Sequence, residues 1–302
     1  MALLLLLFVL LLPQRPAAPP AAMDPEALCQ AFLARFNQER QTAGLAPLRM
    51  VDSLNGIAQD NAEDVRKTKA ALFEEKSIRE IRLRVLRAGY EAHGWSYSFA
   101  VSPGDVDEVF SWWKTSNADA YTRLLDPNYT DVGIGVSEYE NTPLYTFLFA
   151  WREEEYFAQQ TTGLRDLERV RQTMLARVNA ERATAGAPPL ALDPRLTAAA
   201  QSHAEDMLAR SYYGHESPEG TRPRDRIQAK GYTPEMVAEN IARGALSVDD
   251  AVDGWLRSQE HRRNLLHPRL SEMGIGLAVG KDRTGYTAVW VQTFGTPRPS
   301  IP

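Results

Sequence analysis

Phe36-Asn37-Gln38-Glu39-Arg40 and Val178-Asn179-Ala180-Glu181-Arg182 are two versions of one segment, and their asparagines lie 142 positions apart. The same stagger relates Thr42-Ala43-Gly44 to Thr184-Ala185-Gly186, Ala62-Glu63-Asp64 to Ala204-Glu205-Asp206, and Gly89-Tyr90 to Gly231-Tyr232. After a slip of one position, Gly133-Ile134-Gly135 matches Gly274-Ile275-Gly276. Solenoid units are far shorter than this repeat, so we expect two copies of a whole domain.

The two copies differ in their ionisable residues. Four polar residues of the second copy, His203, His215, Glu239 and His261, stand opposite Asn61, Phe73, Tyr97 and approximately Asp119 of the first. The second copy has therefore kept a set of imidazoles and a carboxylate that the first copy has lost. This difference places the candidate chemistry in the second copy.

Length and composition set the broad class of protein. A chain of 302 residues allows about two ordinary domains. With 44% hydrophobic and 24% charged residues the chain is typical of globular proteins. Its 34 basic and 39 acidic residues give a net charge of −5 without a basic tract, so we do not expect a nucleic-acid partner. Cys29 is the single cysteine, which excludes an intramolecular disulfide, a paired-cysteine zinc site and a CxxC redox motif.

The N-terminus carries an unbroken apolar run from Leu3 to Leu12. A membrane-spanning helix needs roughly 20 apolar residues, so this run is too short to span a bilayer. Its length suits the core of a signal peptide, and the small residues 17–22 suit a cleavage site. We therefore expect residues 1–22 to be a signal peptide, an extracellular or periplasmic location, and no transmembrane span in the mature chain. Because no Lys or Arg precedes the run, a true start at Met23 is the alternative.

The repeat also gives the domain boundaries. The first domain is expected over residues 25–153, a charged and polar linker over 154–163, the second domain over 164–297 and a short tail over 298–302. In the second domain, apolar residues at helical spacing predict a helix over 167–178, which Gly186 ends. Asp193 and Pro194 predict the start of a second helix.

The rest of the second domain is expected to begin with helices and end with strands. A short helix is expected over 224–230, ended by Gly231, and another from Ser247 through Trp255, with Asp250 near its start. Strands are expected over 273–279 and 286–294, joined by a turn over 280–285. Helices followed by antiparallel strands predict the α+β class.

The local sequence around the polar residues does not by itself indicate a catalytic site. His215, Glu239 and His261 are separated by 24 and 22 residues, which fits no compact zinc motif. Local sequence alone favours structural histidines and a hydrogen-bonded carboxylate. His203 shares an apolar helical face with Leu196 and Met207, so we expect a hydrogen-bonded residue of the core or cleft floor. Loop bracing is expected of Arg226, Arg262 and Asn264, and core packing of Trp255 and Trp290.

An ordered series of motifs in the second copy resembles the CAP superfamily (cysteine-rich secretory proteins, antigen 5 and pathogenesis-related proteins), in its bacterial SCP-like branch. The matching segments are 178–182, Ala204-Glu205-Asp206-Met207, His215, Arg226-Ile227 with Gly231-Tyr232, Ala238-Glu239-Asn240-Ile241, Trp255-Leu256-Arg257-Ser258, His261-Arg262-Arg263-Asn264-Leu265-Leu266, Met273-Gly274-Ile275-Gly276 and Val289-Trp290-Val291-Gln292-Thr293-Phe294. They span essentially the whole second copy, in order and with suitable gaps. The ordered series is far more specific than any one of its segments.

The resemblance implies an α-β-α sandwich with a central antiparallel sheet and an open cleft, lined in many relatives by two histidines and two acidic residues. His215 and His261 match the histidine positions, and Glu239 matches the first acidic position. The second acidic position falls on Ser258. Two imidazoles and one carboxylate with open positions are a candidate Zn²⁺ site, with His215 and His261 as the metal ligands.

The first copy resembles a degenerate domain of the same type. Phe73 in place of His215 and Tyr97 in place of Glu239 would fill the cleft with aromatic surface, while Trp113 still matches Trp255. An exposed aromatic cluster would favour binding of an apolar partner, and a buried cluster would favour a structural role. The residues of this cluster are Trp95, Tyr97, Phe99 and Trp112.

Three classes of function follow. The first is a secreted or periplasmic binding module whose second-domain cleft takes a lipid, a cell-wall glycan fragment or a peptide through His215, Glu239 and His261. The alternative is a hydrolase, with Glu239 as general base toward a metal-bound water, or with Ser258 as a nucleophile activated by His261. The third class is a structural or interaction protein in which the pairing of the domains matters most.

Overall fold

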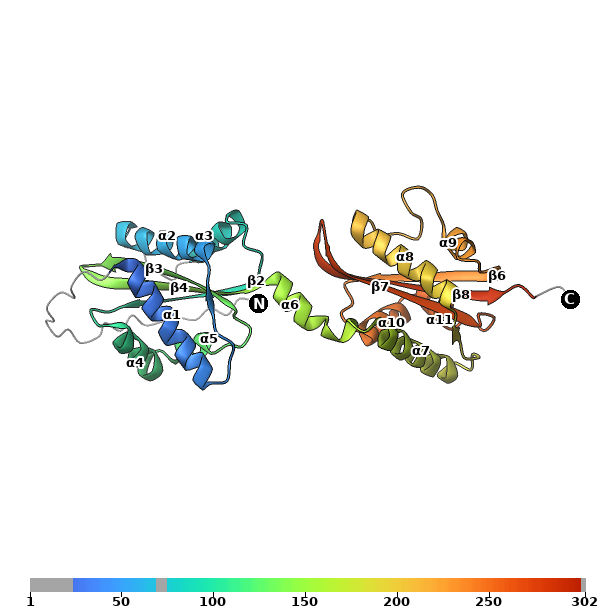
Figure 1. Ribbon diagram of the computed structural model, residues 1–302, viewed down its shortest axis with the longest axis horizontal. Coiled ribbons are helices and arrows are strands. Elements are labelled where there is room, and N and C mark those ends of the chain that lie inside the picture. Colours follow the sequence, from blue (N-terminus) through green and yellow to red (C-terminus); the bar gives the residue numbers. More distant parts are fainter. Residues whose placement is uncertain (1–23, 69–74, 300–302) are drawn as a thin grey trace. The chain divides into compact units, whose positions relative to one another are not determined.

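The computed structural model describes residues 24–68 and 75–299. The chain divides into two compact units between Tyr156 and Phe157. Each unit holds one four-stranded sheet with helices on both faces (Figure 1). This confirms the predicted α+β class with two tandem α-β-α sandwiches. The expected signal peptide and Phe73 lie outside the described residues.

The first unit contains helices α1 (Pro25–Thr42), α2 (Asp52–Thr68), α3 (Glu75–Arg87), α4 (Val106–Ser116) and α5 (Ala118–Leu124) and strands β1 (Arg49–Met50), β2 (Ala92–Val101), β3 (Asp131–Tyr139) and β4 (Thr142–Arg152). Its strand order is β1-β3-β4-β2. The short β1 pairs with β3 in parallel, and the other neighbours are antiparallel.

The second unit repeats this order of elements. It contains the 3₁₀ turn η1 (Thr162–Leu164), helices α7 (Leu167–Thr184), α8 (Pro194–Arg210), α9 (Pro223–Ala229), α10 (Val248–Arg257) and α11 (Gln259–Leu265) and strands β5 (Ala191–Leu192), β6 (Pro234–Arg243), β7 (Glu272–Asp282) and β8 (Gly285–Pro297). Its strand order, β5-β7-β8-β6, is that of the first sheet. The expected helix starts are present: the side chain of Asp193 accepts hydrogen bonds at the start of α8, and that of Ser247 accepts one from Asp250 N at the start of α10.

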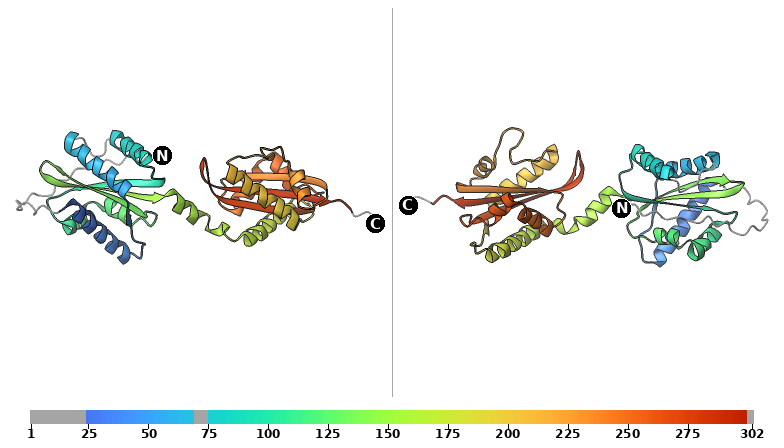
Figure 2. Two further views of the ribbon diagram at one scale, coloured as in Figure 1. Left: turned by 45° about the horizontal axis from the view of Figure 1, so that its top comes forward. Right: turned by 180° about the vertical axis from the view of Figure 1, so that it is seen from behind.

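Each sheet separates two layers of core. In the second unit α7, α10 and α11 bury Met174, Trp255 and Trp290 on one face of the sheet, and α8 packs Met207 with Ile241 on the other. The two-sided covering of each sheet is visible from both directions in Figure 2. Trp255 and Trp290 are buried, as expected, and each indole N–H donates to a backbone carbonyl.

Glycine spacing explains why the Gly-Ile-Gly segment is repeated. A Cβ atom on Gly274 would lie 2.1 Å from the carbonyl carbon of Leu196, and one on Gly276 would lie 2.2 Å from that of Ala200. Strand β7 therefore packs directly against the backbone of α8. Gly133 and Gly135 make the same close approach to α2.

A buried arginine in each copy links the first long helix to the segment that precedes the central antiparallel hairpin. This segment lies between α11 and β7 in the second copy and between α5 and β3 in the first. Arg182 is fully buried and donates to the carbonyl oxygens of Pro188, Leu265, His267 and Leu270 at 2.7 to 3.2 Å. Arg40 makes the matching bonds to Ala46, Leu124, Asp126 and Tyr129 in the first copy. The carbonyls at the end of α11 would otherwise be unsatisfied and buried, so this arginine fixes where α11 ends.

The last hairpin differs from the sequence-based expectation, and the expected linker contains a helix. The hairpin turn is tighter than residues 280–285, because β7 continues to Asp282, whose carboxylate accepts from Thr284 N, and β8 begins at Gly285 with φ of 122°. The stretch 154–163 is largely helical, since α6 (Glu153–Gln160) covers most of it. Within the described residues, no helix is both long and apolar enough to cross a membrane.

Candidate functional site

The candidate site is centred on Glu239, which lies in strand β6 opposite Thr293 of β8. Glu239 lies within the strand, which runs without interruption to Arg243. Its side chain is only 3% exposed. A buried carboxylate is costly unless it is paired, so the partners of Glu239 decide what it can do.

The main partner of Glu239 is Arg226 of α9. Arg226 Nη2 lies 3.0 Å from Oε1 and 2.9 Å from Oε2 of the carboxylate. The same guanidinium donates to the carbonyls of Thr221 and His215, both at 2.9 Å. The expected loop bracing by Arg226 is confirmed. Its ion pair with Glu239 is a second role that the sequence did not indicate.

His215 is the second partner of Glu239. Its Nδ1 lies 2.9 Å from Glu239 Oε1, and its side chain is half exposed. A carboxylate only accepts hydrogen bonds, so Nδ1 carries the proton of this bond. Neutral His215 therefore has Nε2 as its acceptor, with the ring orientation fixed by Glu239.

His261 comes to the same region from α11. An amide network ties this helix to β6: Asn240 Nδ2 donates to His261 O at 3.1 Å, and Asn264 Nδ2 donates to Glu239 O at 3.3 Å and to Asn240 Oδ1 at 2.9 Å. Burial lowers the pKa of His261 below its usual value, and the proximity of His215 lowers it further. His261 is therefore neutral at neutral pH.

His203 supports the site from beneath. It is 2% exposed, its Nε2 lies 2.9 Å from Gly214 O, and its Nδ1 lies 3.4 Å from the hydroxyl of Tyr212. Burial lowers its pKa. The expectation of a hydrogen-bonded buried residue is confirmed, and the bond to Gly214 holds the loop just before His215.

Ser258 lies outside the helix that carries His261. It separates α10 from α11, with φ of −89° and ψ of 123°. Its backbone N–H bonds to Trp255 O, and its carbonyl accepts from Arg262 N. Among the described residues no hydrogen bond joins Ser258 Oγ to His261, so this pair lacks the contact that an activated nucleophile needs.

The donors at this site do not fit a Zn²⁺ ion well. Both oxygens of Glu239 are engaged by Arg226, and a cation would have to displace or face that guanidinium. Within residues 24–68 and 75–299, no group of three or more His, Cys, Asp or Glu side chains is arranged to hold a metal. His215 and His261 alone leave the usual zinc coordination incomplete.

The first copy shows what remains when the polar set is lost. Tyr97 occupies the position of Glu239 in β2 and is buried. Arg84, the counterpart of Arg226, donates instead to Asn61 Oδ1 at 3.0 Å and to Asp64 Oδ2 at 2.5 Å. Retention of this arginine in a copy without the carboxylate is the signal that it has a structural role.

The aromatic residues of the first copy do not form one exposed cluster. Tyr97 belongs to the core beneath α2 and α3, where Trp95 and Phe99 pack against it. Trp112 packs against the other core, beneath α1 and α4. This division favours the structural role over binding of an apolar partner.

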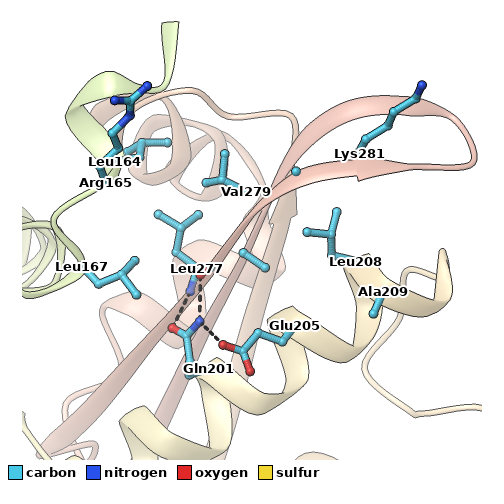
Figure 3. Close-up of a pocket in the computed structure, with 12 residues that line it drawn as sticks. Leu164, Arg165, Leu167, Gln201, Glu205, Leu208, Ala209, Leu277, Val279 and Lys281 are labelled. Carbon is cyan, nitrogen blue, oxygen red and sulfur yellow. Dashed lines mark hydrogen bonds between the residues drawn. The ribbon is translucent and has the colours of Figure 1, made fainter. Parts of the chain in front are cut away.

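A separate open pocket of about 610 Å³ lies in the second unit, away from His215, Glu239 and His261. Its lining comes from η1, α7, α8 and β7, as Figure 3 shows. Leu164, Leu167, Leu208 and Leu277 supply apolar surface. Gln201 caps the strand edge there by accepting from Leu277 N at 3.2 Å and donating to Leu277 O at 2.9 Å (Figure 3). Arg165, Glu205 and Lys281 also line the pocket, which therefore offers charged groups beside its apolar surface.

Comparison with known proteins gives a family match in both halves of the chain. The model of the cysteine-rich secretory protein family (CAP) matches residues 33–151 and again residues 175–294. The uncharacterised protein YkwD of Bacillus subtilis is 33% identical over 116 residues, which are 38% of this chain and 43% of that protein. The uncharacterised membrane protein YlbC of the same organism is 30% identical over 116 residues, 38% of this chain and 32% of YlbC. The matched region thus spans less than half of either relative.

Solved structures of similar proteins are more distant in sequence. An extracellular protein containing an SCP domain from Bacillus anthracis is 21% identical, with a TM-score of 0.38, over 58% of this chain and 61% of that one.

Proposed function

Because the chain belongs to the cysteine-rich secretory protein (CAP) family along most of its length, we propose that it is an extracellular binding protein whose second domain holds a polar ligand through His215, Glu239 and His261. The ligand class is a cell-wall glycan fragment or a peptide. Hydroxyl, amide and carboxyl groups of such ligands can bond to imidazole nitrogens. The first domain acts in this proposal as a scaffold.

The observation that supports binding best is the pairing of Glu239 with Arg226 and His215. A carboxylate held at 2.9 to 3.0 Å by two nitrogen groups has a fixed position and orients an imidazole well. His215 is half exposed and presents Nε2 away from Glu239. This is the arrangement of a fixed hydrogen-bonding group in a binding site.

Hydrolysis is less well supported by the same contacts. A metal-dependent mechanism would need Glu239 as a base, and that carboxylate is engaged by Arg226. A serine mechanism would need a contact between Ser258 and His261, and among the described residues no hydrogen bond joins their side chains. The imidazole of His215, oriented by Glu239, is a feature of many catalytic sites. It is equally suited to hydrogen bonding with a ligand, so it does not by itself indicate catalysis.

The proposal can be tested by calorimetric titration of the full chain with muramyl dipeptide and with an N-acetylated chitotetraose. We expect saturable binding of one probe, weakened about tenfold or more in His215→Ala and His261→Ala. His93→Ala, a histidine change in the first domain, is the matched control and should bind as the wild type does. Absence of binding with both probes, or equal binding by all variants, would refute the proposed site.

A second candidate ligand class is favoured by the leucine-lined pocket. A lipid acyl chain would contact Leu164, Leu208 and Leu277, whereas the ion-paired cluster at Glu239 offers it nothing. A fluorescent fatty acid such as parinaric acid tests this candidate. Leu208→Gln should abolish its binding, and His215→Ala should not affect it. The opposite pattern would assign lipid to the polar site.

A further inference from the structure

The outward face of α3 carries exposed leucines among arginines. Ile78, Leu83 and Leu86 are 48%, 36% and 66% exposed, although Ile81 and Val85 of the same helix are buried at 1% and 3%. Large apolar side chains are otherwise exposed at Tyr213 and Val279 within the described residues. One side of α3 is therefore buried in the core. Its other side exposes apolar side chains that make no contribution to the core.

Helical spacing brings the exposed residues together. Arg79, Leu83 and Leu86 follow one another at intervals of four and three residues, so they share one stripe of α3. Arg82 precedes Leu86 by four residues and Arg87 follows Leu83 by four, so both flank the stripe. All three arginines are exposed. Leucine side chains at the centre are thus surrounded by guanidinium groups.

The charges on this face are largely uncompensated by the protein. Arg84 points back to Asn61 and Asp64 of α2. The guanidinium of Arg87 is 3.7 Å from Glu80, a separation that water screens readily. In the described parts of the chain, Arg79 and Arg82 make no ion pair. The positive face stands out on a chain whose net charge is −5.

The second copy provides an internal comparison. At the 142-residue stagger, Val85 corresponds to Ile227 of α9, and both are buried. Leu83 and Leu86 correspond to Asp225 and Gln228, and both of these are exposed. Arg79 and Arg87 correspond to Thr221 and Ala229. The fold therefore requires the core position, and the leucines and two of the arginines are particular to the first copy.

We propose that α3 docks the protein on an anionic phospholipid surface. The leucines would enter the boundary between head groups and acyl chains while Arg79, Arg82 and Arg87 bind head-group phosphates. Apolar residues central to a ring of cations are the pattern of a helix that lies in a membrane interface. An acidic protein surface would match the arginines but would leave the exposed leucines without an apolar environment.

The test is flotation of the full chain with vesicles of phosphatidylglycerol and phosphatidylcholine in equal parts, and with vesicles of phosphatidylcholine alone. We expect binding to the anionic vesicles only, and a decrease at high salt. Leu83→Asp with Leu86→Gln should lower the partition coefficient about tenfold or more. Arg79→Thr with Arg87→Ala should lower it about twenty-five-fold, at about fivefold for each arginine.

These variants take the residues found at the same stagger in the second copy, and circular dichroism and the Tm would verify that each variant keeps the fold of α3. Tyr213→Gln, which removes an exposed aromatic residue from the second unit, is the matched control and should bind as the wild type does. Failure of the wild type to bind anionic vesicles would overturn the proposal, as would equal binding to phosphatidylcholine or undiminished binding by both double variants. Self-association abolished by Leu83→Asp with Leu86→Gln, without vesicle binding, would assign the face to a second copy of the chain.

Discussion

Arg226 Nη2 bonds to both carboxylate oxygens of Glu239, at 3.0 and 2.9 Å, across thirteen residues of sequence. The pair joins α9 to β6, and it also fixes the loop of His215, whose carbonyl accepts from the same guanidinium. Both side chains are largely removed from water, at 11% and 3% exposure. The ion pair therefore decides the geometry of the candidate site as well as its charge.

Arg226→Gln should destabilise the second unit by about 3–5 kcal/mol, because it leaves Glu239 buried without its cation. Arg224→Gln is the control, since Arg224 of the same helix makes only long bonds to carbonyls. Urea denaturation measures both variants. Addition of Glu239→Gln should recover part of the loss, and a single-variant loss below about 1 kcal/mol would contradict this account of the pair.

The stability of the second unit should fall in mild acid because of His203. Burial lowers the pKa of His203 in the folded state, so between that value and the unfolded value of about 6.5 the unfolded chain binds more protons. The free energy of unfolding is thus highest above about pH 6.5 and decreases as the pH falls through the folded pKa. His261 adds to this trend with the same sign.

The measurement is urea denaturation as a function of pH for the wild type and for His203→Asn, which takes the residue found at Asn61 in the first copy. The variant should lose part of the pH dependence between neutral and mildly acidic conditions. An unchanged slope would show that His203 does not carry the effect.

Two glycines of β7 should respond very differently to alanine. Gly276→Ala should cost about 3 kcal/mol or more, because the new Cβ would lie 2.2 Å from the backbone of Ala200. Gly280→Ala should cost less than about 1 kcal/mol, because its nearest neighbour is the flexible Cδ2 of Leu208 at 3.2 Å. Thermal unfolding distinguishes them, and equal shifts in Tm would argue against the close approach of β7 to α8.

Zn²⁺ should bind weakly to this chain. A calorimetric titration of the wild type is expected to give no saturable heat at micromolar metal, because Arg226 occupies the carboxylate that would be the third ligand. The double variant His215→Ala with His261→Ala should give the same trace. Tight binding by the wild type that the double variant loses would restore the metal site and favour metal-assisted hydrolysis.

Comparison of the two copies shows which structural contacts can be predicted from an internal repeat. The stagger of 142 residues pairs Arg40 with Arg182, and a slip of one position pairs the Gly-Ile-Gly segments; the structure gives the two members of these pairs matching contacts, whereas Arg84 and Arg226 differ. Predictions that depended on capping residues, such as the start of α8 at Asp193, hold because capping is a local interaction. The turn after β7 is shorter than its sequence indicates, and the carboxylate of Asp282 accepts a hydrogen bond from Thr284 N within it.

Within the candidate site, the sequence named the polar residues but not their partners. His215, Glu239 and Arg226 are widely spaced along the chain, and only the packing of α9 against β6 brings them within hydrogen-bonding distance. Ser258 and His261 are close in sequence, but Ser258 has extended backbone between α10 and α11, whereas His261 lies within α11. Distance along the sequence therefore did not predict which of these site residues are in contact.

The sequence by itself determined the duplication, the α+β class and the copy that kept its ionisable side chains, because these follow from local patterns and from the comparison of one half with the other. Tertiary structure alone decided that Glu239 is neutralised by an arginine, that His203 supports the loop, and that two leucines of α3 face outward. The physical reason is that pairing and burial depend on which elements meet in space. A carboxylate has the same sequence signal whether it faces solvent, a metal or a guanidinium.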